Sequence, residues 1–305
     1  MTDRIVPWIQ AARPKTLPAA AVPVILGGAL AGAGGTFTLL PWSICLAFAL
    51  LIQVGTNYAN DYYDFVKGAD DERRIGPKRA VASGWVSPGA MKRGMILVFA
   101  LAFAVGSLLI PWGGWWLVLV GLASVACGVA YTGGPYPLGY NGWGDVFVFV
   151  FFGWVATAFT YYVQSGTFLF EVSGAMGAGW VWLAGMVPGA LSTNLLVVNN
   201  VRDEPLDREA GKRTLAVRFG RLTGVVEFIG LNALALAVPV YFATVGGLRW
   251  CLLVLLVAPL MGRVSRNLIE ARERESYQRV LGMTALLLLS TGLLFAAGLV
   301  MSGRD

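Results

Sequence analysis

Nine apolar stretches run through this sequence, each close to the length that a helix needs to cross a lipid bilayer. About 20 residues of helix span roughly 30 Å of hydrocarbon. Small residues are frequent within the stretches, and they allow close contact between membrane helices. The pattern therefore predicts an all-α integral membrane protein. The stretches cover residues 17–35, 39–63, 94–111, 115–132, 143–163, 175–199, 222–244, 250–268 and 280–302.

The composition excludes a soluble globular protein of this size. Hydrophobic residues form 57% of the 305 residues and charged residues 13%, whereas soluble domains carry about 25% charged residues. A soluble core could not bury so much apolar surface. Histidine is absent, which removes the commonest general base and metal ligand. Any chemistry must therefore use carboxylates, cations, amides and aromatic rings.

The basic residues predict how the spans are oriented. All 23 lysine and arginine residues except Arg249 and Arg304 lie before the first span, after the second and sixth, or from the end of the eighth onward. Cytoplasmic segments carry such an excess, so we expect a multi-pass protein of the cytoplasmic (inner) membrane. Its N-terminus would be cytoplasmic and its C-terminus outside. The same cause explains the net charge of +6 without nucleic acid as a partner.

A polar stripe marks the end of the second span. Gln53, Asn57, Asn60, Asp61 and Asp64 are spaced so that they share one side of a helix with 3.6 residues per turn. Ionisable groups within membrane spans usually face the bundle interior or a water-filled cavity. We therefore expect this stripe to point inward.

A second polar cluster closes the sixth span. Asn199, Asp203 and Asp207 repeat at intervals of four residues, and the spacing of the first pair matches that of Asn57 and Asp61. In both places a glycine and then basic residues follow, and both clusters fall on the predicted cytoplasmic side. This weak repeat suggests a single domain, 1–305, built from two related halves of about 1–142 and 143–305, each supplying half of one site.

Two carboxylate–amide clusters beneath basic loops fit a magnesium–diphosphate site. Mg²⁺ takes oxygen ligands, typically one or two carboxylates together with substrate phosphates. Nearby lysine and arginine side chains could neutralise a departing diphosphate. The alternative interpretation is that these residues are helix-end caps and solvated loop charges.

Five stretches of the sequence carry a family resemblance. They are ARPKTLPAAAVPVILGG, NYANDYYDFVKGAD, RIGPKR, YTGGPYPLGYNGWGDVFVFVFFG and LVVNNVRDEPLDREAGKRTLAVRFG. Together they resemble the UbiA-type superfamily of intramembrane aromatic prenyltransferases, over nearly the whole chain. RIGPKR, TGGPYPLGY and NNVRD are most similar to the branch that acts on 1,4-dihydroxy-2-naphthoate.

The resemblance implies nine transmembrane helices around a central cavity, beneath cytoplasmic cap loops. It implies a Mg²⁺-bound polyprenyl diphosphate and catalytic roles for the residues that match the two motifs. Asp61, Asp64, Asp203 and Asp207 would bind the metal. The catalytic set would be Asn57, Asp61, Asp64, Asp203, Asp207 and Lys212.

Two positions leave this assignment open. The superfamily's first motif often continues with an acid where this chain has Gly68, and Asp70 or Asp71 could serve instead. Pro205 disfavours a regular helix through Val201, so we expect Asp207 on a loop or on a fresh helical turn.

Further residues are candidates for binding substrate. Basic side chains on the predicted cap could meet diphosphate, although topology alone would also explain them. Aromatic rings could stabilise a prenyl carbocation, although packing or interfacial anchoring would also explain them. The candidates are Arg13, Lys67, Arg73, Arg74, Lys78, Arg79, Asn199, Tyr58 and Tyr131.

The reaction that the resemblance implies is prenyl transfer to 1,4-dihydroxy-2-naphthoate, with loss of carbon dioxide and diphosphate, to give demethylmenaquinol. The alternatives are another aromatic acceptor, 4-hydroxybenzoate or homogentisate, and a membrane transporter. Transporter sites usually lie near the membrane midplane at a repeat interface, whereas the acids here collect at one end of the spans. The oligomeric state and the length of the prenyl chain stay open.

Overall fold

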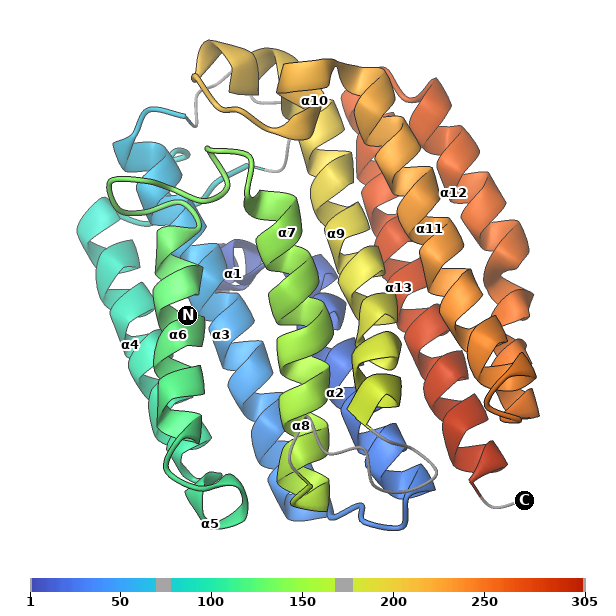
Figure 1. Ribbon diagram of the computed structural model, residues 1–305. Coiled ribbons are helices and arrows are strands. Elements are labelled where there is room, and N and C mark those ends of the chain that lie inside the picture. Colours follow the sequence, from blue (N-terminus) through green and yellow to red (C-terminus); the bar gives the residue numbers. More distant parts are fainter. Residues whose placement is uncertain (1, 70–77, 168–177, 304–305) are drawn as a thin grey trace.

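The computed structural model describes residues 2–69, 78–167 and 178–303, and all regular secondary structure in these residues is helical (Figure 1). The fold class predicted from the sequence is therefore confirmed. The elements are α1 (Thr2–Ala12), η1 (Pro14–Thr16), α2 (Leu17–Ala33), α3 (Leu39–Val66), α4 (Pro88–Ser107), α5 (Ile110–Gly113), α6 (Leu117–Ala130), α7 (Gly144–Phe149), η2 (Val150–Val155), α8 (Ala156–Ser165), α9 (Ala178–Glu209), α10 (Leu215–Phe219), α11 (Arg221–Thr244), η3 (Arg249–Val257), α12 (Ala258–Glu270) and α13 (Arg274–Ser302).

Eight of the nine expected spans correspond to helical stretches long and apolar enough to cross a membrane, counted over the described residues. The ninth, expected at 115–132, is the shorter α6, with 14 residues. It begins at Leu117, after Gly114 with a φ of 80° has turned the chain at the end of α5, and it ends at Ala130. The long helices lie side by side in one bundle (Figure 1).

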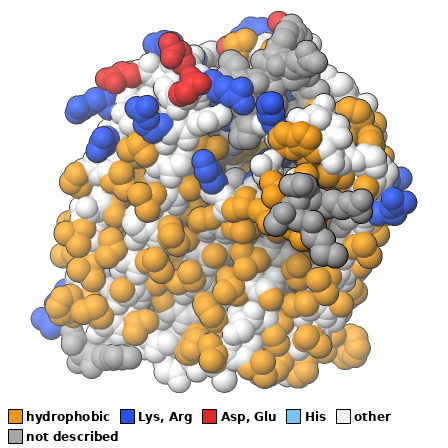
Figure 2. Space-filling view, turned by 180° about the vertical axis from the view of Figure 1, so that it is seen from behind, with side chains coloured by type: hydrophobic (Ala, Val, Ile, Leu, Met, Phe, Trp, Pro, Cys, Tyr) orange, Lys and Arg blue, Asp and Glu red, His pale blue; other side chains and the backbone are white. Residues whose placement is uncertain are grey.

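The surface of the bundle is what a lipid environment requires. Leucines on several helices are exposed, including Leu97, Leu119 and Leu256. Figure 2 shows a broad hydrophobic surface over the middle of one face, with charged side chains concentrated above it. Because lipid chains are as apolar as these side chains, exposed leucine costs nothing there. The chain is thus a multi-pass membrane protein.

The break expected near Pro205 is wrong. Helix α9 continues through both Pro188 and Pro205 to Glu209, so Asp207 lies on the same helix as Asp203. A proline removes one backbone donor and bends a helix, but membrane helices tolerate it where neighbouring groups satisfy the freed carbonyl. The two acids consequently stay one turn apart on one rigid element.

Glycines bring η2 and α9 into backbone contact near the centre of the bundle. A β-carbon at Gly153 would lie 2.6 Å from the carbonyl oxygen of Gly185 and 2.8 Å from the α-carbon of Gly189. Real side chains do not approach backbone so closely, so this helix contact requires glycine. The contact fixes α9 next to the segment that follows α7, and both of these lead up to the polar end of the bundle.

Gly153→Ala should therefore destabilise the protein. We expect a cost of about 1–3 kcal/mol, typical of overpacking, because η2 must move away from α9. Gly230→Ala is the matched control, since nothing lies within 4 Å of a β-carbon built there. Thermal unfolding in detergent should give a lower apparent melting temperature for Gly153→Ala alone. Equal melting temperatures for the two variants would contradict the close contact.

Candidate active site

The polar stripe of α3 is buried, as its spacing predicts. The exposed fractions are 3% for Asn57, 1% for Asp61 and 4% for Asp64. Burying a charge in an apolar bundle is unfavourable unless the charge is paired or hydrogen-bonded. The partners of each side chain therefore indicate what the stripe does.

The part of the stripe at Asn57, together with the adjacent Tyr58, forms hydrogen bonds with the N-terminal segment of the chain. The amide of Asn57 donates to the backbone oxygen of Ala12, at 2.9 Å, and to the hydroxyl of Thr16, at 3.3 Å. The Tyr58 hydroxyl donates to the backbone oxygen of Trp8, and the rings of Tyr58 and Trp8 pack edge to face. Both candidates thus fasten α1 and its turn into α2 against α3.

Asp61 holds a cap loop. Its two carboxylate oxygens accept from the backbone N–H groups of Ala80 and Val81, each at 3.0 Å. Ala80 and Val81 are themselves buried, in a hydrophobic cluster with Met91 and Phe99. This carboxylate is enclosed by backbone donors.

Asp64 is the acid of the first motif that faces charged and hydroxyl groups. One oxygen accepts from the Arg79 guanidinium at 3.0 Å, and the other from the Tyr140 hydroxyl at 2.8 Å. Arg79 immediately precedes the pair of residues that Asp61 holds. The two acids therefore cooperate in placing one arginine at the end of the bundle.

The second motif is also paired with cations. Asp207 lies 2.8 Å from the Lys212 ammonium. Asp203 accepts two bonds from the neighbouring Arg202, at 2.6 and 2.7 Å. The Asn199 amide donates to the backbone oxygen of Leu195 on its own helix.

Tyr140 joins the two motifs. Its hydroxyl donates to Asp64, and two ammonium groups approach its ring, with Lys67 at 5.0 Å and Lys212 at 4.8 Å from the ring centre. Its backbone oxygen accepts from the N–H of Arg213 at 2.7 Å. The loop between α6 and α7 thus bridges segments about 140 residues apart, and the structure brings the two polar clusters together.

Sequence reasoning did not identify Tyr140. It lies in YTGGPYPLGYNGWGD, a segment rich in glycine, proline and tyrosine on the same side of the membrane as both motifs. Its position on that side is the sequence feature that could have indicated a role for Tyr140. Spacing within a helix cannot reveal a loop residue that reaches both helices.

A second place where residues of both motifs come close together lies around Tyr131, just after α6. Asp145, Asp64, Asp207 and Arg13 lie close enough to Tyr131 for their charges to act on its hydroxyl group. Asp145, at the start of α7, is buried, and its carboxylate accepts a long bond from Asn200 at 3.4 Å. The structure therefore places Tyr131 and Arg13 near the acids of both motifs.

Of the remaining basic candidates, Lys67 and Lys78 lie within the described residues. Lys67 is exposed and donates to the backbone oxygen of Thr132 at 2.7 Å; partial desolvation lowers its pKa, against an opposing effect of Asp64. Lys78 is exposed. Arg73, Arg74, Asp70 and Asp71 lie outside the described residues.

The acids fit a divalent cation unequally. No cluster of three or more acidic, cysteine or histidine side chains arranged for a metal occurs within the part of the chain that the structure describes. Mg²⁺ needs only one or two carboxylates when phosphates complete its shell. Asp64, Asp203 and Asp207 are paired with side-chain cations that substrate phosphates could draw away. Asp61 differs from them, because each of its oxygens accepts from a backbone N–H group, which cannot be drawn away as a side-chain cation can.

Fold and site together define a helical membrane protein with a buried acid and cation site at one end of its bundle. The sequence profile described as the UbiA prenyltransferase family matches residues 20–289. The chain belongs to this family of prenyltransferases.

Relatives match this chain over nearly its full length. It is 38% identical to 1,4-dihydroxy-2-naphthoate octaprenyltransferase of Mycobacterium tuberculosis, over 96% of both chains. It is 35% identical to the Escherichia coli protein of the same name, over 97% of this chain and 95% of that one.

Solved structures share the fold. A UbiA homolog from Aeropyrum pernix superposes with a TM-score of 0.69 at 18% identity, covering 93% of this chain and 97% of that one. A UbiA homolog from Archaeoglobus fulgidus, bound to DMAPP and Mg²⁺, superposes with a TM-score of 0.58 at 14% identity, covering 95% and 99%.

The role of Asp61 can be tested without any substrate. Asp61→Asn replaces one acceptor oxygen by an N–H₂ group that faces a backbone donor. We expect the Ala80–Trp85 amides to exchange with deuterium about tenfold faster or more, since two hydrogen bonds of about 1 kcal/mol each are disturbed. Asp203→Asn, in the other motif, should leave this segment protected. Unchanged exchange in Asp61→Asn would show that the loop is held by other contacts.

Proposed function

We propose that this protein transfers a polyprenyl group from polyprenyl diphosphate to 1,4-dihydroxy-2-naphthoate. The products are demethylmenaquinol, carbon dioxide and diphosphate. The observation that carries the proposal is 38% identity to a 1,4-dihydroxy-2-naphthoate octaprenyltransferase over 96% of both chains. The joining of two acid and cation clusters over Tyr140 supports it, because a diphosphate needs such a site.

The diphosphate binds at this polar end. Lys67, Arg79 and Lys212 lie around Tyr140 and Asp64 and supply three cations. Hydrogen bonds between cationic donors and phosphate are roughly twice as strong as neutral ones. These side chains are already charged and positioned before substrate arrives. When the diphosphate binds, they exchange their present carboxylate and aromatic partners for its oxygens.

Mg²⁺ would be held by Asp64, Asp203 and Asp207. When bound, it neutralises charge that develops on the diphosphate. The Archaeoglobus fulgidus homologs bound to Mg²⁺ together with DMAPP or GPP support a divalent ion in this family. Asp61 instead holds the loop that carries Arg79.

The bond changes require no base at the ring carbon. The bond between the allylic carbon and the diphosphate oxygen breaks, and its electron pair leaves with the diphosphate. The ring carbon that bears the carboxylate forms the new carbon–carbon bond. The electron pair of the carbon–carboxylate bond then restores the aromatic ring as carbon dioxide leaves. This balance suits a chain that contains no histidine.

The alternatives have less support. The relatives between 32% and 38% identity carry the naphthoate name, which does not favour 4-hydroxybenzoate or homogentisate as acceptor. Membership of a prenyltransferase family does not favour a transporter. The site opens to the cytoplasm in this proposal, because the basic cap residues follow the positive-inside rule.

The acceptor can be determined directly. Purified protein with Mg²⁺, a prenyl diphosphate and each aromatic acid in turn should prenylate 1,4-dihydroxy-2-naphthoate and release carbon dioxide. Product mass and trapped carbon dioxide are the readouts. Exclusive turnover of 4-hydroxybenzoate would overturn the acceptor, and no turnover with any acid by folded protein would overturn the reaction.

The Mg²⁺ dependence of turnover should distinguish the acids that bind the metal from Asp61. Chelation should abolish turnover, and Mg²⁺ should restore it. Asp64→Asn and Asp207→Asn should lower kcat by about 100-fold or more, as removal of a charge-stabilising group does, and should raise the Mg²⁺ concentration that gives half-maximal rate. Asp61→Asn should lower kcat without shifting that Mg²⁺ concentration. A shifted Mg²⁺ requirement in Asp61→Asn would return this residue to the metal site.

Tyr140 should matter through both its ring and its hydroxyl. Tyr140→Phe keeps the ring beside the two ammonium groups and loses one hydrogen bond, so we expect about a tenfold loss in kcat/KM. Tyr140→Leu loses the cation–ring contacts as well, each worth roughly 0.5–2 kcal/mol, and should lose considerably more. Steady-state kinetics with varied prenyl diphosphate would show this order, and equal losses would refute a role for the ring.

A further inference from the structure

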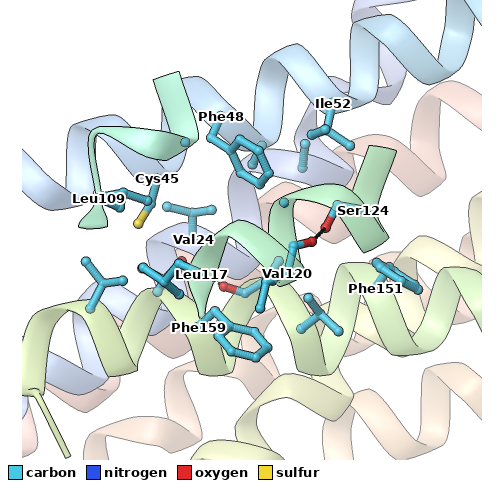
Figure 3. Close-up of a pocket in the computed structure, with 18 of the residues that line it drawn as sticks. Val24, Cys45, Phe48, Ile52, Leu109, Leu117, Val120, Ser124, Phe151 and Phe159 are labelled. Atoms are coloured by element: carbon cyan, nitrogen blue, oxygen red, sulfur yellow. Dashed lines mark hydrogen bonds between the residues drawn. The ribbon is translucent and has the colours of Figure 1, made fainter. Parts of the chain in front are cut away.

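Helices α12 and α13 carry charged groups that the proposed function does not use. Figure 3 shows an apolar cavity within the bundle, with Phe48 on one side and Phe159 on the other. The described residues that line it lie between Ala20 and Val163, so α12 and α13 are outside it. The two acid clusters belong to α3 and α9. The charges on α12 and α13 therefore need a separate explanation.

Three arginines on these helices are exposed, Arg263 and Arg266 on α12 and Arg279 on α13. Within the residues that the structure describes, none of the three forms a hydrogen bond, an ion pair or a ring contact. Exposed acids are available on the same helices and on the turn between them. These acids are Glu270, Glu273 and Glu275. The three guanidinium groups thus point to a partner other than the protein.

Two neighbouring arginines have a structural role instead. Arg221 and Arg272 donate to backbone oxygens between Leu268 and Ala271, at 2.7–3.1 Å. The last carbonyls of a helix lack partners within the helix, and a cation is favourable there. Capping of α12 therefore explains these two side chains, but not the three exposed ones.

The depth of Arg263 and Arg266 places them beside lipid. Both belong to the stretch Arg249–Glu270, which is long and apolar enough to span a membrane. Apolar side chains are exposed on either side of them along the chain, with Leu256 at 71% and Ile269 at 46%. A charge at this depth is unfavourable without a counter-charge, and long basic side chains extend toward the headgroups. The anion present at that level of a bilayer is the lipid phosphate.

Arginines from both helices approach one region of the surface. The Asn267 amide donates to the sulfur of Met283 at 3.3 Å, which sets the register of the two helices. Arg263 lies one turn from Asn267 toward the membrane centre, and Arg279 lies one turn from Met283 toward the opposite end. Their levels differ by about 12 Å along the helix axes. Arg266 lies between these levels, so guanidinium groups from α12 and α13 can meet one headgroup.

The surface between these arginines is open. Gly262 precedes Arg263, and Gly282 lies between Arg279 and Leu286 on α13. A β-carbon built at either glycine has nothing within 4 Å. Leu286 is 55% exposed and lies one turn from Gly282 toward the membrane centre. A headgroup can therefore approach the backbone while an acyl chain of the same molecule lies along Leu286.

We propose that α12 and α13 bind an anionic phospholipid, with Arg263, Arg266 and Arg279 holding its phosphate. The planar guanidinium group forms two parallel, charge-assisted hydrogen bonds with phosphate. Basic residues on the cytoplasmic side of membrane helices attract anionic lipids in the same way. The inference does not depend on the proposed reaction, because these side chains lie outside the acid and cation site.

The test measures lipid binding to the intact protein. Native mass spectrometry in detergent, with phosphatidylglycerol added, should show bound lipid on the wild-type protein. In the double variant Arg263→Gln/Arg266→Gln, the concentration needed for the same occupancy should rise by about tenfold or more, since two charges near the headgroup are lost. The double variant Arg263→Lys/Arg266→Lys keeps both charges and should lose less.

Lys92→Gln/Arg93→Gln is the matched control. Both residues are exposed at the start of α4, on the predicted cytoplasmic side, and their replacement removes the same charge. This variant should bind phosphatidylglycerol as the wild-type protein does. Equal losses in the two glutamine variants would show a general effect of surface charge and would overturn the site.

Two further ligands distinguish the source of the anion. Phosphatidylcholine should bind at least tenfold more weakly than phosphatidylglycerol, because its headgroup has no net charge. Inorganic phosphate should not displace phosphatidylglycerol, because it lacks the acyl chain that contacts Leu286. Equal binding of both lipids, or displacement by inorganic phosphate, would overturn the assignment. Each result can be read whether or not the protein prenylates any acceptor.

Discussion

Pairing of buried carboxylates is the constraint on which the polar end of this protein depends. Four aspartates lie at the end of an apolar bundle, with exposed fractions of 9% or less. An isolated buried charge is strongly unfavourable, so each acid needs a partner, and for Asp61, Asp64 and Asp207 the partner comes from a loop. Those loops are thereby held over the bundle, and the acids organise the cap as well as the site.

Tyr140 completes this arrangement by serving both halves of the site. It donates to Asp64, and its ring contacts Lys67 and Lys212. Two cations close to each other would repel, but their attraction to the negative face of the aromatic ring offsets part of that cost. In the proposed function, a bound diphosphate would offset this repulsion more completely.

Helix α3 unites two environments. Toward its C-terminal end it carries acids and amides that bind loops, and toward the middle it contributes Cys45, Phe48 and Ile52 to an apolar cavity. A prenyl diphosphate has the same division, with a charged head and a hydrocarbon tail. One rigid helix thus aligns a polar and an apolar compartment along its length.

Sequence alone determined that the chain crosses a membrane, that the stripe from Gln53 to Asp64 faces inward, and that two acid clusters lie at one end, because hydropathy and helical periodicity are local properties. It did not separate the roles of Asp61 and Asp64, identify Tyr140 or predict that α9 continues through Pro205. Those depend on which loop reaches which carboxylate and which neighbour supports a helix. Only the tertiary structure decides them, since the contacts join segments far apart in the chain.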